Sequence, residues 1–144
     1  MSLHTGQIGE TICMLRLLRM GVPCSLVHFL KTDILAQEDK RHIRIQVKSS
    51  AYKNSYRRKN AREYWCYHFS ICSGGHPKQP LTKAVCDVVA LVALDMDKVI
   101  FINVEDLKGN VTKRLAKKDF YETCEEDSWK KCFYNRDEQS NKTL

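Results

Sequence analysis

The first pattern along the chain is a helical one. Residues 6–20 are rich in residues that favour helices, and their apolar side chains recur on one stripe. The run stops at Gly21, and Pro23 follows closely, which is the usual order at a helix C-terminus. We therefore predict a helix over residues 6–20.

Shorter apolar runs with strand character follow the helix. Some alternate apolar and polar residues, and others are continuously apolar, as buried strands are. The runs cover residues 22–30, 33–36, 42–48, 64–71, 88–94 and 99–104. Residues 22–30 read as a buried strand, 33–48 as a hairpin closed by a polar loop at 38–41, and 88–104 as a second hairpin. Together they predict a sheet of about five strands.

The C-terminal part has fewer apolar anchors. After Gly109 the chain is charged, so we expect one or two peripheral helices and a frayed tail over residues 136–144. Residues 1–135 are then a single domain. The predicted fold class is α/β, with a mixed central sheet flanked by helices.

Composition narrows the function classes. The 144 residues are 43% hydrophobic and 28% charged, which excludes a disordered chain, and no apolar run approaches the roughly 20 residues of a transmembrane helix. The net charge of +7 favours a polyanionic partner. Seven cysteines and the absence of a signal-like N-terminus predict reduced thiols and a cytoplasmic protein.

One stretch concentrates the positive charge. Five cations and no acid occur over residues 53–62, which we expect to form a loop or short helix that grips DNA phosphates. These candidate DNA-binding residues are Lys53, Arg57, Arg58, Lys59 and Arg62. The alternative is a plain solvated loop.

An acid lies on the apolar stripe of the predicted helix. On a helical wheel Glu10 falls on the side of Cys13 and Leu17, and an acid there needs a partner, a metal or a proton. A functional site near Glu10 is one explanation. The other is a first-turn glutamate that favours the helix N-terminus and points past its end.

The first hairpin brings three polar side chains together. With a loop at 38–41, residue 37 pairs with 42, and the same register sets Asp33 opposite Gln46, with Lys48 on the face of Gln46. A one-residue slip would send Asp33 to the other face. An acid, an amide oxygen and a lysine, joined by a helix acid, suit Mg²⁺-assisted phosphodiester hydrolysis, with the ammonium stabilising developing charge or helping to deprotonate water.

These residues carry a resemblance to a known family. Gly6-x-x-Gly9-Glu10, then Asp33, then Ile45-Gln46-Val47-Lys48-Ser49 resemble the PD-(D/E)XK nuclease superfamily over about residues 6–104. The glutamine most resembles the group I intron-associated homing endonucleases of that fold, followed by the archaeal Holliday-junction resolvases. Thr32 stands where the family name writes Pro, and Gln46 removes a charge from the metal site.

The resemblance implies a restriction-endonuclease-like α/β core, a single nuclease-like domain over residues 1–135, and the roles of the site residues. Asp33 would be the central metal ligand, Gln46 would replace the second acid, Lys48 would be the catalytic lysine, and Glu10 the helix-borne acid. The carbonyl of Val47 would be a further ligand. The cofactor would be Mg²⁺, with Mn²⁺ able to substitute, and the partner DNA, with no membrane and no small organic cofactor. Cleavage of two strands implies a homodimer or homotetramer.

Several alternatives remain open. The lost charge at Gln46 could leave a DNA-binding module that no longer cleaves, and a junction resolvase is a third possibility. Asp87 could line the site or cap a turn. Cys66, His68, Cys72 and His76 are close enough in sequence to suggest zinc, although free cysteines are commonly buried hydrophobes. Trp129 and Phe133 are candidates for a contact between subunits.

Overall fold

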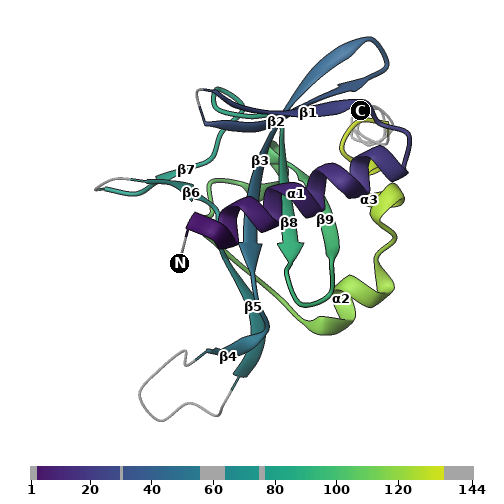
Figure 1. Ribbon diagram of the computed structural model, residues 1–144. Helices are drawn as coiled ribbons and strands as arrows, with labels where there is room; N and C mark the ends of the chain where they lie inside the picture. Colours follow the sequence, from purple (N-terminus) through teal and green to yellow (C-terminus); the bar gives the residue numbers. More distant parts are fainter. Residues whose placement is uncertain (1–2, 30, 56–63, 75–76, 135–144) are drawn as a thin grey trace, which may run out of the picture.

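A mixed five-stranded sheet forms the centre of the protein (Figure 1) in the computed structural model, which describes residues 3–29, 31–55, 64–74 and 77–134. Its strand order is β1 (Cys24–Phe29), β2 (Thr32–Glu38), β3 (Arg41–Ser50), β8 (Val88–Ala93) and β9 (Lys98–Asn103). Neighbours are antiparallel except β3 and β8, which are parallel. The predicted α/β class and mixed sheet are confirmed.

Helix α1 (Leu3–Arg19) crosses one face of this sheet (Figure 1) and confirms the predicted helix. It ends in a Schellman motif, because the N–H of Gly21 donates to the Leu18 carbonyl and that of Val22 to the Leu17 carbonyl, both at 3.0 Å. Gly21 has a φ of 82°, which a residue without a Cβ adopts readily. Cys13 and Leu17 are fully buried against the sheet.

The other face of the sheet is covered by a second, three-stranded sheet and a short helix. The small sheet has the order β10 (Thr112–Leu115), β5 (Tyr64–Ser70), β4 (Lys53–Ser55), and the helix is α2 (Lys117–Glu122). Tyr67 and Phe120 pack there against Val89 and Leu91, while Val88 and the alternate residues of β8 face α1. Because β8 is buried on both faces, its sequence is continuously apolar.

The remaining elements are short. Strands β6 (Cys72–Ser73) and β7 (Gln79–Pro80) pair with each other, and a 3₁₀ helix, η1 (Val104–Leu107), follows β9. Helix α3 (Glu125–Lys131) packs against β9, so both predicted peripheral helices are present. Within the described residues, no helix combines the length and apolarity needed to cross a bilayer.

The hairpin of β2 and β3 has the predicted register. Gln37 pairs with His42, and Ile34 with Ile45. The predicted four-residue loop is a two-residue turn, since Glu38 pairs with Arg41 and only Asp39 and Lys40 lie between. Both turn residues have positive φ, of 50° and 65°, as a type I′ turn requires. The register is unchanged because the shorter turn only adds the pair of Glu38 and Arg41 to the end of the same ladder.

Two strand predictions were wrong in placement. Residues 22–30 do not form a buried strand: β1 is the edge strand, pairs with β2 alone and is largely exposed. Residues 64–71 do not belong to the central sheet, because β5 pairs with β4 and β10 instead. The basic stretch likewise begins as strand β4 rather than as a loop or helix.

Trp129 does not form the expected subunit contact. Its side chain is 2% exposed and packs edge-on against Phe101, with ring centroids 5.1 Å apart. Its indole N–H donates to Glu38 at 3.0 Å, so the ring joins α3 to the central sheet. Phe133 is partly buried beside it. The predicted tail, residues 136–144, lies outside the described residues.

Candidate active site

Glu10 reaches the sheet because α1 lies unusually close to β3. A Cβ on Gly9 would overlap the Ser49 hydroxyl and stand 3.0 Å from the Ser49 Cβ, so glycine permits this approach. The next residue, Glu10, is thereby held near the sheet, and its side chain is only 15% exposed. The inward position predicted for Glu10 is confirmed.

Asp33 lies where β2 and β3 stop pairing. The strand ladder reaches Ile34 and Ile45, and the next β3 donor on that side, the N–H of Val47, goes to Asp33 Oδ2 at 2.8 Å. The carboxylate therefore takes the place of a backbone carbonyl. This exchange fixes Asp33 against β3 at the point where the two strands separate.

A third residue, which the sequence analysis missed, completes this group. His28 Nε2 lies 3.4 Å from Glu10 Oε2, and ligand atoms of Glu10, His28 and Asp33 all lie within 4.8 Å of one another. Among the described residues, this is the one group of three His, Cys, Asp or Glu side chains whose ligand atoms lie so close together. His28 occurs in an apolar run without a motif, so the sequence carried no signal for it.

The surroundings of Glu10 change its pKa. Burial raises the pKa of Glu10 first, the nearby negative charge of Asp33 raises it further, and His28 opposes the shift. Two acids this close favour a shared proton or a bound cation, since both cannot be ionised without repulsion. The group therefore attracts positive charge.

Gln46 is an unsatisfied polar residue beside this group. The hairpin register, continued by one residue, places it opposite Asp33 on the neighbouring strand. Its Oε1 is buried and has no hydrogen-bond partner among the described residues. Leaving such an acceptor unpaired costs about 1–3 kcal/mol. An amide oxygen with open lone pairs and two carboxylates form a donor set that fits a hard divalent cation.

Lys48 lies two residues further along β3, on the same strand face as Gln46. Its ammonium donates to the carbonyl of Cys72 on β6 at 3.1 Å. The structure thus anchors Lys48 beside the site through a backbone acceptor and not through an ion pair with either carboxylate.

The basic stretch is described only in part. Lys53 lies exposed on β4, in the arm that β4 and β5 extend away from the body (Figure 1), while Arg57, Arg58, Lys59 and Arg62 lie outside the described residues. Half-exposed Trp65 lies on the same arm, with its ring 5.6 Å from that of Tyr52.

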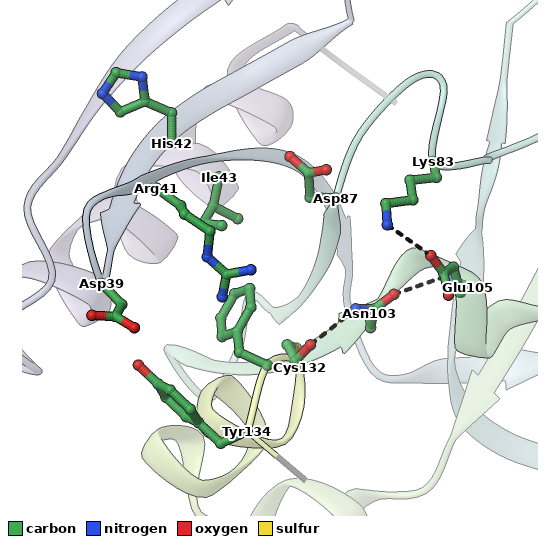
Figure 2. A pocket seen from close by; sticks show the side chains of 11 residues that line it. Asp39, Arg41, His42, Ile43, Lys83, Asp87, Asn103, Glu105, Cys132 and Tyr134 are labelled. Carbon is green, nitrogen blue, oxygen red and sulfur yellow. Dashed lines mark hydrogen bonds and ion pairs between the residues drawn. The ribbon is translucent and has the colours of Figure 1, made fainter. Parts of the chain in front are cut away.

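Asp87 belongs to a separate hollow near the start of β3, with a volume of about 540 Å³ (Figure 2). Its carboxylate accepts from the Arg44 backbone N–H at 2.9 Å and from the Arg44 guanidinium at 3.2 Å. In the same hollow, Lys83 pairs with Glu105 at 3.2 Å. Asp87 thus ties β8 to β3 and does not join the Glu10 group.

The cysteines do not assemble the suggested zinc site in the part of the chain that the structure describes. Cys66 and Cys72 are buried, and neither they nor His68 belong to a close group of metal-binding side chains. His76 lies outside the described residues. The two cysteines therefore act as small core residues here.

Comparison with known proteins places the fold. No family model matches the chain, and no curated protein matches it by sequence. A solved structure of a bacterial homing endonuclease, I-Ssp6803I, is similar with a TM-score of 0.61 and 16% sequence identity. The similarity covers 80% of this chain and 78% of that one. The chain therefore has the fold of this nuclease.

Proposed function

We propose that the protein is a metal-dependent DNA endonuclease of the PD-(D/E)XK type, similar to the homing endonucleases. The observation that carries this proposal is the pair of adjacent carboxylates, Glu10 and Asp33, next to the unpartnered oxygen of Gln46. The fold of a homing endonuclease and the net charge of +7 support it. We also propose that residues 1–135 form one nuclease domain.

The proposed cation site contains oxygen ligands from three elements. Glu10 of α1, Asp33 of β2 and Gln46 of β3 would hold Mg²⁺, for which Mn²⁺ could substitute. The N–H of Val47 points toward Asp33. In a strand the carbonyl of the same residue points to the same side, which favours the Val47 carbonyl as a further ligand. When bound, the cation would supply charge neutralisation for a phosphate and activation of a water.

The protein residues would divide the remaining work. Asp33, fixed by the Val47 N–H, would orient the site rigidly relative to β3. The Lys48 ammonium would either break its hydrogen bond to the Cys72 carbonyl or keep it and donate a second one to the phosphate. In both cases it would stabilise the negative charge that develops on the phosphate. Lys53 on β4, together with Arg57, Arg58, Lys59 and Arg62 of the same basic stretch of sequence, would bind the DNA backbone.

The test is cleavage of supercoiled plasmid and of a four-way junction with Mg²⁺, Mn²⁺ or EDTA. We expect cutting that needs metal and is lost in Asp33→Ala and in Lys48→Ala. Lys118→Ala, which removes an exposed charge from α2, is the matched control and should cut as wild type does. Undiminished cutting by the Asp33 and Lys48 variants would refute the proposal. Preference for the junction would favour a resolvase.

A non-cleaving DNA-binding module is the second candidate, because Gln46 supplies no charge to the site. It predicts DNA binding with a steep salt dependence but no cutting of either DNA, even with millimolar Mg²⁺ or Mn²⁺. A metal titration that leaves Asp33 unoccupied under these conditions would favour it over the endonuclease.

Cutting both strands of DNA would require at least a symmetric pair of sites. We therefore also propose a homodimer or homotetramer. Because Trp129 is buried within the chain, the contact must use other residues. Light scattering at working concentration should give a mass of two or four chains, and a monomer would contradict this part of the proposal.

A further inference from the structure

His28 is turned toward the Glu10 group by an irregularity in strand β1. The pairing of β1 with β2 is regular from Cys24 to Leu26 and shifts before Phe29. Within this bulge His28 has a φ of 47°, a left-handed conformation that few residues other than glycine adopt. Bulges of this kind commonly re-aim a side chain beside an active site. Here the result is an imidazole 3.4 Å from Glu10.

The distances in this group suit a single ion. Two ligands of one octahedral ion, each at about 2.1 Å, lie roughly 3.0 Å apart when adjacent and 4.2 Å when opposite. The Glu10–His28 distance of 3.4 Å falls within that range, and the whole group lies within 4.8 Å. Small side-chain rotations would bring all three ligand atoms onto one cation. The 56% exposure of the His28 side chain leaves an open side for water or phosphate.

We propose that the imidazole of His28 is a direct ligand of the cation held by Glu10 and Asp33, and that it shifts the metal preference of the site from Mg²⁺ toward Mn²⁺ and Co²⁺. Imidazole nitrogen suits first-row transition metals, whereas Mg²⁺ takes oxygen ligands almost exclusively. The inference rests on the proposed function, since it concerns the same cation.

A different role for His28 predicts the opposite result. If the imidazole only forms an ion pair with Glu10, it competes with every cation for the carboxylates of Glu10 and Asp33. Its removal would then strengthen the binding of Mg²⁺ and of Co²⁺ alike. If it is a ligand, its removal weakens Co²⁺ binding selectively. The sign of the change therefore separates the two roles.

The experiment is calorimetric titration of Co²⁺ and Mg²⁺ into wild type, His28→Gly and His42→Ala. Glycine suits the positive φ at position 28, and His28→Asn is a second variant that tolerates it. Exposed His42 lies away from the group and controls for adventitious binding to surface imidazole. We expect His28→Gly to weaken Co²⁺ binding by at least the roughly 10- to 100-fold that loss of an outer-shell partner of a metal ligand costs. Mg²⁺ binding should change less than about 3-fold, and His42→Ala should match wild type.

A spectroscopic measurement provides a second readout. Pulsed electron paramagnetic resonance of bound Mn²⁺ should show coupling to imidazole nitrogen in wild type and lose it in His28→Gly. Unchanged or tighter Co²⁺ binding by His28→Gly, or no nitrogen coupling in wild type, would overturn the inference.

Plasmid cleavage with Mn²⁺, measured on the same preparations, distinguishes the two ways of failing. Wild type that cuts DNA and binds Co²⁺ no better than His28→Gly would refute the role of His28 alone. Wild type that binds Co²⁺ through His28 but cuts no DNA would refute the proposed function alone. Wild type that binds neither ion at millimolar concentration would refute both.

Discussion

Arg44 and Gln46 lie two residues apart on one face of strand β3, but their surroundings differ in how completely the polar groups are paired. Arg44 donates to Asp87 and to the carbonyls of Lys83 and Ala84, so the local charges are compensated. Further along, Gln46 has a buried oxygen without a partner among the described residues, and Glu10 and Asp33 repel each other nearby.

The comparison favours the Glu10 group over the hollow around Asp87 as the proposed site. The hollow around Asp87 is large, yet its ion pairs join β3, β8 and η1 and serve the fold. The Glu10 group is defined by incomplete compensation, which is the electrostatic signature of a site prepared for a ligand.

Replacing the aspartate beside Gln46 and the aspartate beside Arg44, one at a time, should separate function from stability. We expect Asp33→Asn to reduce DNA cleavage about 100-fold or more, because it removes a charge that would hold the cation. Asn can still accept from the Val47 N–H, so the fold should persist. Plasmid cleavage rates and urea unfolding of the same samples provide the two measurements.

Asp87→Asn should instead lower stability and leave cleavage nearly unchanged. It weakens the acceptor of the Arg44 guanidinium and should lower the free energy of unfolding by about 1–3 kcal/mol. Cleavage at temperatures where the variant remains folded should stay within about 3-fold of wild type, because Asp87 does not belong to the Glu10 group. If both variants lose stability and neither loses cleavage, the distinction between the surroundings of Arg44 and those of Gln46 is wrong.

Gly9→Ala tests the close approach that positions Glu10. The added Cβ meets Ser49, so we expect overpacking to lower the free energy of unfolding by about 1–3 kcal/mol. Gly6→Ala is the matched control, since a Cβ there meets nothing within 4 Å. That variant should gain about 0.5–1 kcal/mol from helix propensity. Equal effects of the two substitutions in chemical denaturation would contradict the argument.

Gln46→Met should stabilise the metal-free protein. It replaces a buried unpaired amide with an apolar side chain of similar length, and a gain of about 1 kcal/mol is expected in urea unfolding with EDTA. The same variant should bind Mg²⁺ more weakly. A loss of stability would show that Gln46 Oε1 is satisfied in solution, for example by water.

The pH dependence of stability tests the state of Glu10. Its pKa is raised from the ordinary 4.5 in the folded protein, so the folded state binds this proton more tightly than the unfolded state does. The contribution of Glu10 to stability is therefore lost as pH rises from about that value through the folded pKa. Glu10→Gln should remove this slope in EDTA and be more stable than wild type at neutral pH. Parallel pH profiles of stability for wild type and Glu10→Gln would argue against a raised pKa of Glu10.

Much of the local structure follows from the sequence. The apolar stripe with Gly21 and Pro23 predicted α1, and the continuous apolar run predicted a β8 buried on both faces. The position of the turn between β2 and β3 predicted their register, which puts Asp33 opposite Gln46 when it is continued past Ile34 and Ile45. These features depend on the period of a helix or strand and on the length of a turn, all of which are properties of neighbouring residues.

Only the tertiary structure decided which distant segments meet. The exposed edge position of β1, the departure of β5 into a second sheet and the burial of Trp129 depend on strand pairing across long separations. The tertiary structure also decided that Asp87 binds Arg44 outside the Glu10 group, and that a bulge in β1 turns His28 toward that group. Pairing of this kind depends on competition among whole strands for the same core. The residues next to His28 in the sequence therefore do not predict where its side chain lies.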